Sequence, residues 1–139
     1  SMNPKYLNKM LNLCKNLDLV FTSRYQYPGG GSEDDTFVTF IGNKIFSFLG
    51  NFLFDLKISD ILFTYILANT KSVKSLKLKS KDFRLCVELP IKAKRSGLKY
   101  LCIPSFERSR IGGSKKVNAI KDGFLILTSI ISLFFKKNN

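Results

Sequence analysis

The spacing of hydrophobic residues predicts a helix followed by a strand at the start of the chain. Asn3 and Pro4, which suit a helix N-cap and first turn, precede apolar residues at helical spacing in KYLNKMLNLC, so a helix is expected over about 4–16. The run DLVFTSRY, over 18–25, is rich in β-branched and aromatic residues, which is typical of a buried strand. A helix that leads directly into a strand indicates an α/β fold.

Two different segments follow this strand. YPGGGSEDD combines a proline with three consecutive glycines and is expected to be a mobile loop without regular structure. From Gly42 to about Asp55 an amphipathic helix is expected, because apolar and polar residues fall on separate sides. The apolar side comprises Phe48, Leu49, Phe52, Leu53 and Leu56, and the polar side comprises Lys44, Ser47, Asn51 and Asp55.

The second half of the chain predicts two more helices, a strand and a last helix. Thr70 is expected to cap a short helix, and Asp82 to cap a longer one over 83–96 that contains Pro90. LKYLCIPS, over 98–105, reads as a strand. The last helix is expected over 117–135, with one stripe formed by Ile120, Phe124, Leu127 and Ile131.

Composition favours one folded domain, over 1–139, and restricts its chemistry. The chain has 139 residues, of which 45% are hydrophobic, enough for one modest core. It has no histidine, which excludes histidine-based acid–base catalysis and most transition-metal sites. Cys14, Cys86 and Cys102 have no C-x-x-C spacing, so neither a disulfide framework nor a zinc site is predicted, and a reducing cytosol fits best.

The net charge of +13 favours a polyanionic partner: a nucleic acid, an anionic membrane surface or a phosphorylated substrate. Nucleic acid is the least expected of these, since no recognition motif is present and the aromatic residues are expected to face the core. The apolar run GFLILTSIISLFF, over 123–135, is shorter than the roughly 20 residues that cross a bilayer. It is interpreted as a buried helix or one lying in the membrane interface, which implies a cytoplasmic protein or one peripheral at the cytoplasmic membrane face.

A phosphate site is indicated by the segment FERSRIGGSKK. Gly112 and Gly113 let backbone N–H groups approach an anion, and Arg108, Arg110 and Lys115 add charge-assisted hydrogen bonds. The segment also precedes a predicted helix N-terminus, where the helix dipole favours negative charge. A solvated basic loop is the alternative interpretation, and the interleaved glycines favour phosphate binding over it.

Three other charged residues are candidates for the same site. Arg24 follows the first strand, and ligands of α/β domains gather at the carboxyl ends of strands. Asp60 either lines the same cleft or caps a turn. Glu88 is either a partly desolvated general base or an ordinary helix ion pair with Lys92, and the spacing favours the ion pair. The acids of the glycine loop, 33–35, are interpreted as solvated charges, and no metal site is predicted.

Three blocks of the chain together resemble a known family. LDLVFTSRY with PGGG, then GNKIFSFLGNFLFDLKISDILFTY, then DFRLCVELPIKAKRSGLKYLCIPSFERSRIGGSKKVNAIKDGFLIL are similar in order and spacing to the C-terminal half of family 2 glycosyltransferases like dolichol-phosphate mannosyltransferase. The last block is the most specific, with its E-L-x-I-K-A-x-x-x-G-L-K helix, its strand ending in IPS and its R-x-G-G-S-K motif. The resemblance implies a GT-A-like, Rossmann-like domain that lacks its N-terminal donor-binding half.

The resemblance also implies a function. Such enzymes transfer a sugar, with inversion, from a nucleotide-sugar to an acceptor such as a polyprenyl phosphate. It puts Arg24, Arg110, Ser114 and Lys115 around donor or acceptor phosphates and Asp60 in the cleft. The D-x-D motif and its Mg or Mn ion belong to the donor half, so no cofactor is expected in this part and the chain alone is expected to be inactive. Strand edges that would pair with that half predict a homo-oligomer.

Overall fold

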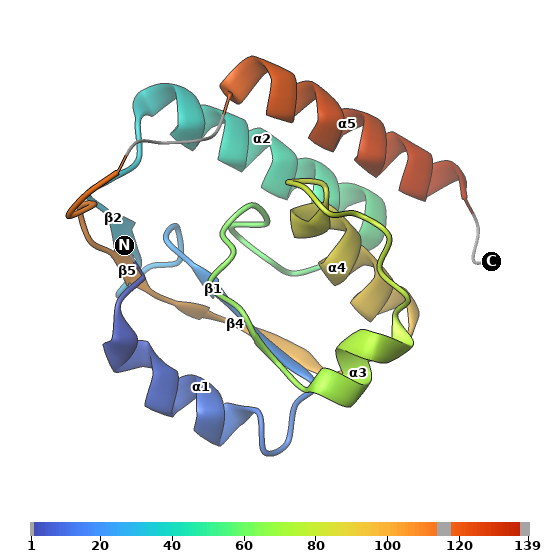
Figure 1. The fold of residues 1–139 in the computed structure, drawn as a ribbon, viewed down its shortest axis with the longest axis horizontal. Helices are drawn as coiled ribbons and strands as arrows, with labels where there is room; N and C mark the ends of the chain where they lie inside the picture. Colours follow the sequence, from blue (N-terminus) through green and yellow to red (C-terminus); the bar gives the residue numbers. More distant parts are fainter. Residues whose placement is uncertain (1, 114–117, 137–139) are drawn as a thin grey trace.

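In the computed structural model, which describes residues 2–113 and 118–136, a fully buried strand, β1 (Leu19–Ser23), runs through the centre of the fold (Figure 1). It pairs in parallel with β4 (Tyr100–Pro104) and antiparallel with β3 (Leu67–Ala68). A separate parallel pair joins the short strands β2 (Gly31–Ser32) and β5 (Phe106–Glu107). The sheets are therefore small and the larger one is mixed.

Helices cover both faces of the larger sheet (Figure 1). The helices of the described part are α1 (Leu7–Leu13), preceded by a 3-10 turn, α2 (Phe37–Phe54), α3 (Thr70–Ser75), α4 (Leu85–Arg95) and α5 (Ala119–Phe135). Val20 packs with Met10 of α1 on one face, whereas Leu19 and Phe21 belong to the larger core that includes residues of α4 and α5. Alternate residues of β1 thus fill two cores, which is why the whole strand is hydrophobic or small.

The mixed α/β class and most predicted elements are confirmed, including the first helix, both long strands and the last two helices. The Asn3 side chain accepts a hydrogen bond from the Lys5 backbone, as an N-cap does. Four details are wrong. The N-cap of α4 is Arg84, with no side-chain cap, and not Asp82. The glycine loop contains β2, α2 begins at Phe37 behind a Thr36 cap, and the cap of α3 is Asn69, with Thr70 already inside the helix.

The orientation of α2 is the largest departure from the expected fold. An amphipathic helix ordinarily turns its apolar side toward the core. Here the buried positions are Asn43, Ser47 and Gly50, whereas Phe48 and Phe52 are 65% and 75% exposed. The expected orientation is therefore reversed at these positions, although Phe46, Leu53 and Phe54 of α2 still pack against the core and Lys44 is exposed.

The segment that follows α2 explains this reversal. Residues 55–66 form neither helix nor strand, so their backbone groups need partners from elsewhere. Asn51 hydrogen-bonds both the N–H and the C=O of Ile58, and Ser47 Oγ accepts from the N–H of Ile61. Gly50 allows the close approach, since a Cβ there would lie 2.7 Å from Ile61 Cδ1. Polar side chains of α2 thus take the place of a β-ladder.

This reversal predicts an unusual pair of mutational effects. Asn51→Leu should destabilise the fold by about 1–3 kcal/mol, although it adds hydrophobic surface, because the N–H and C=O of Ile58 would lose their partners. Phe52→Asn, at the next position, should change stability by less than about 0.5 kcal/mol, because that ring is exposed. Urea denaturation measures both. The opposite order of effects would mean that α2 packs through its apolar side.

Candidate phosphate-binding cavity

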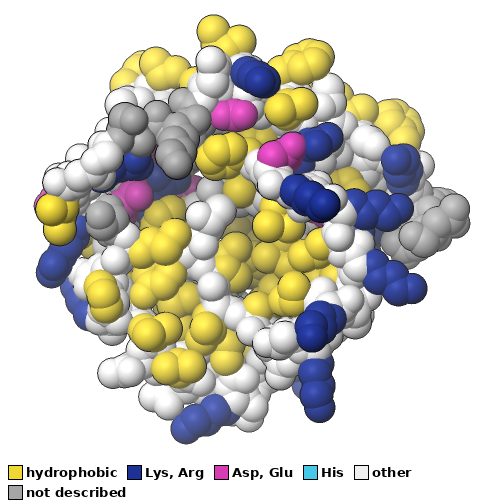
Figure 2. All heavy atoms as spheres, viewed as in Figure 1, with side chains coloured by type: hydrophobic (Ala, Val, Ile, Leu, Met, Phe, Trp, Pro, Cys, Tyr) yellow, Lys and Arg dark blue, Asp and Glu magenta, His cyan; other side chains and the backbone are white. Residues whose placement is uncertain are grey.

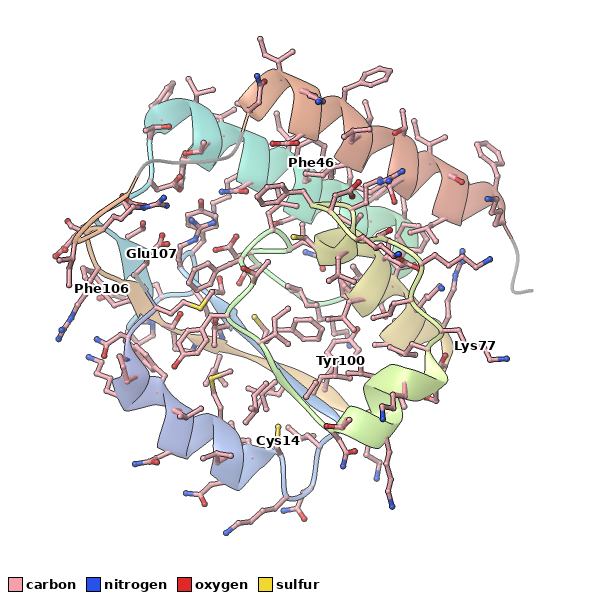
Figure 3. All side chains as sticks on the ribbon, in the orientation of Figure 1. Cys14, Phe46, Lys77, Tyr100, Phe106 and Glu107 are labelled. Carbon is pink, nitrogen blue, oxygen red and sulfur yellow. The ribbon has the colours of Figure 1, made fainter. Side chains whose placement is uncertain are left out.

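A cavity of about 660 Å³ opens where the parallel strands β1 and β4 end. Its wall is built by elements far apart in the sequence. Figure 3 shows two of its residues, Phe46 on α2 and Glu107 on β5. Other lining residues are Arg24, Asp34, Thr39, Asn43, Phe63, Arg110, Asp122 and Ile126. This is the edge of an α/β sheet at which ligands commonly bind.

Arg24 and Asp60 form a buried ion pair beside the cavity. Arg24 Nε donates to Asp60 Oδ2 at 2.7 Å and Nη2 donates to Oδ1 at 3.1 Å, while the Arg24 backbone N–H donates to Oδ2 at 3.2 Å. The Asp60 side chain is fully buried and that of Arg24 is 10% exposed. Planar two-point contact of this kind fixes orientation as well as charge. Asp60 does not line the cavity, contrary to expectation, and it positions Arg24 there.

Glu107 extends this pair to a third element. Its Oε2 accepts from Arg24 Nη1 at 3.2 Å and from Ser32 Oγ at 2.7 Å. The guanidinium also lies 4.6 Å from the centre of the Phe63 ring, within the range of a cation–π contact. Arg24 therefore ties β1 to the 55–66 segment and to β5.

The charge state of this cluster follows from its contacts. Burial disfavours the charged form of Arg24, but its hydrogen bonds with Asp60 and the Asp60 charge outweigh that effect and raise the pKa of Arg24 above its usual value. Burial raises the pKa of Asp60, and the guanidinium opposes that rise. Arg24 thus stays cationic at any physiological pH.

The acids of the glycine loop organise the arginine-rich segment and are not simply solvated charges. Asp34 Oδ2 accepts from Arg110 Nη2 at 3.2 Å. Glu33 Oε2 accepts from the backbone N–H and the hydroxyl of Ser109 at 3.0 and 3.1 Å. With the β2–β5 pairing, these contacts hold the two loops together. The prediction of a loop without regular structure is therefore wrong at 31–32, which form β2, whereas 33–35 form neither helix nor strand.

A hydrogen-bonded chain also connects α2 with the end of β1. Asn43 Nδ2 donates to the Tyr25 hydroxyl at 2.9 Å, and that hydroxyl donates to Asp35, which also accepts from Thr39. Burial and the bond to Asp35 raise the pKa of Tyr25, so the phenol remains protonated. These hydrogen bonds hold the start of α2, which forms part of the cavity wall, in place.

Glu88 lies elsewhere and has a structural role. It pairs with Lys92 at 2.8 Å, the interpretation that its spacing favoured, and its two oxygens also accept from the backbone N–H groups of Lys79 and Ser80. Burial alone would raise its pKa, but these partners lower it to about 2. Glu88 does not line the cavity, and a carboxylate of such low pKa is a poor base.

The structure thus brings together part of the predicted site. Arg24 and Arg110 line one cavity and Asp60 supports it, whereas Arg108 is exposed and is not among the lining residues. Ser114 and Lys115 lie outside the described residues. Glu107 was not predicted as a site residue. Its position just after the predicted strand over 98–105 was the available signal, as the position after the first strand was for Arg24.

Over the described ranges, no group of three or more His, Cys, Asp or Glu side chains is arranged to hold a metal ion. No family model, curated protein or solved structure matches the chain among those compared with it. Over residues 2–113 and 118–136, the protein has a mixed α/β fold with five helices and small mixed sheets.

The low pKa of Glu88 predicts a pH-dependent contribution to stability. At pH 7, Glu88→Gln should cost about 1–3 kcal/mol, because an amide cannot accept through both positions or pair with Lys92. A carboxyl with a lowered folded pKa stabilises above its unfolded pKa of about 4.3 and loses that contribution as pH falls toward about 2. Urea denaturation of both proteins at several pH values should show the difference shrinking between these limits. A difference that grows on acidification would contradict this role.

Proposed function

We propose that the cavity holds the phosphate of an amphiphilic acceptor, and that the chain is the acceptor-side part of an inverting glycosyltransferase with a GT-A-like, Rossmann-like domain. The observation that carries the proposal is that Arg24 and Arg110, 86 positions apart in the chain, line one cavity at the carboxyl ends of β1 and β4. The motif resemblance supports a polyprenyl phosphate as the acceptor.

The charges of the cavity assign different tasks to the two arginines. Four carboxylates also line it: Asp34, Asp35, Glu107 and Asp122. Arg24 hydrogen-bonds Asp60 and Glu107, so its guanidinium is a fixed positive charge in the cavity wall. Arg110 is 39% exposed and pairs with Asp34 at the rim, so a phosphate can take the place of Asp34 on its guanidinium.

Such a site suits sugar transfer to a phosphate. A phosphate oxygen is already an anion, so the reaction needs no base to deprotonate it, only cations that hold it in line with the anomeric carbon. That oxygen forms the new bond to the anomeric carbon while the nucleoside diphosphate departs with the electrons of the broken bond. The nucleotide-sugar and a divalent metal ion are expected on the donor side of the complete enzyme.

Apolar residues beside the cavity suit the lipid part of the acceptor. Val38 and Ile126 line the cavity itself, and Ile120 and Phe124, on the first turns of α5, are 88% and 67% exposed. An acceptor with a phosphate head and an isoprenoid tail would contact the charged residues of the cavity and these apolar residues at once.

Binding of farnesyl phosphate and farnesol, which share one tail, tests the proposal. Calorimetry should show farnesyl phosphate binding more tightly, and Arg110→Ala should reduce that affinity about ten- to a hundredfold, by loss of a charge-assisted hydrogen bond. The same variant should leave farnesol binding unchanged.

Arg84→Ala is the matched control, since Arg84 pairs with Asp82 and does not line the cavity. It should leave both affinities unchanged. Equal affinity for the two ligands, or equal losses in the two variants, would contradict a phosphate site at Arg110.

A further inference from the structure

The outward side of α2 is a continuous apolar stripe. At 100° per residue its exposed hydrophobic residues fall within somewhat less than half of the helix circumference. They are Phe37, Val38, Phe40, Ile41, Ile45, Phe48 and Phe52. The only charged residue of α2 is Lys44. A run of exposed hydrophobic residues with so little charge among them is typical of an interaction site.

The outward side of α5 has the same character. The stripe predicted from the sequence, Ile120, Phe124, Leu127 and Ile131, is exposed, together with Phe134 and Phe135, and Ile126 and Ile130 face the core instead. Asp122 and Lys121, in the first turn, are the charged residues of this helix.

The two helices lie side by side and run in the same direction (Figure 1). Phe46 of α2 lies against Gly123 of α5. Near the C-terminal ends of the two helices, Phe54 contacts Phe134, with 6.1 Å between ring centres. Figure 2 shows hydrophobic side chains projecting along the same rim of the molecule. The outward residues of both helices are called the α2–α5 face below.

Cations lie where the two helices end. Arg95 donates to the Lys136 carbonyl at 2.9 Å and stacks over Phe54, and Lys94 pairs with Asp55. The whole chain carries +13. A second copy would bring this charge against itself, whereas an anionic lipid surface accepts both the exposed rings and nearby cations.

We infer that the α2–α5 face docks on an anionic membrane surface, with both helices lying in its plane. By length and composition α2 could cross a bilayer. Its inner side, however, is committed to the protein through Asn43, Ser47 and Asn51. The helix therefore lies in the interface and does not span it.

Docking through this face would fix the position of the cavity relative to the membrane. Val38 and Gly42 of α2 and Gly123 of α5 line the cavity between the first halves of the two helices. Docking would therefore bring the cavity next to the lipid headgroups. The inference goes beyond the proposed function and rests on it only where it takes the acceptor to be a membrane lipid.

Vesicle co-sedimentation of the full chain tests the inference. Binding to phosphatidylcholine vesicles in which about one lipid in three is phosphatidylglycerol should exceed binding to pure phosphatidylcholine about tenfold or more. Phe48→Asp combined with Phe52→Asp should abolish it, because two charges would enter the apolar stripe. Both rings are exposed, so circular dichroism and thermal unfolding should stay as in the wild type.

Leu11→Asp is the matched control, as Leu11 is 49% exposed on α1, on the other side of the fold (Figure 1). It should bind like the wild type. Phe48 and Phe52 do not line the cavity, which separates this test from that of the phosphate site. Absence of vesicle binding, or binding that the double substitution leaves intact, would overturn the inference. A dimer in solution that the double substitution dissociates, without vesicle binding, would also overturn it and identify a second copy as the occupant.

Discussion

The ion pair between Arg24 and Asp60 is the contact on which the rest of the structure depends. It joins the end of the central strand to a segment, 55–66, that has no helix or strand of its own. Through Glu107 it also reaches β5. A buried charge is costly when unpaired, so each of these elements needs the others in place. The cavity is the space that this three-way junction leaves at the end of the sheet.

The same irregular segment determines what the molecule shows to its surroundings. Because 55–66 has no β-ladder, polar side chains of α2 satisfy its backbone, and apolar residues such as Phe48 and Phe52 are left outside. The α2–α5 face is therefore a consequence of how the core is hydrogen-bonded. The hydrogen bonds between α2 and residues 55–66 therefore affect both the cavity wall and the outward hydrophobic surface.

The sequence predicted elements better than orientations. Spacing located α1, β1, α4, β4 and α5 because hydrophobic period and caps are local properties. The period of α2 predicted an amphipathic helix, but not that Ser47 and Asn51 would face the protein, because both side chains bond to a segment that has no hydrophobic pattern. The ion pairs of Arg24 and Arg110 join residues 36 and 76 positions away in the chain, which local patterns cannot register. The ion pair of Glu88 with Lys92 was predictable because its partner lies one helical turn away.

A crystal structure of the chain soaked with tungstate, an electron-dense analogue of phosphate, tests the central claim most directly. An anomalous peak is expected inside the cavity, in contact with Arg110, with the Arg24–Asp60 pair still intact. Tungstate bound only at other surface cations, with the cavity left empty, would contradict it.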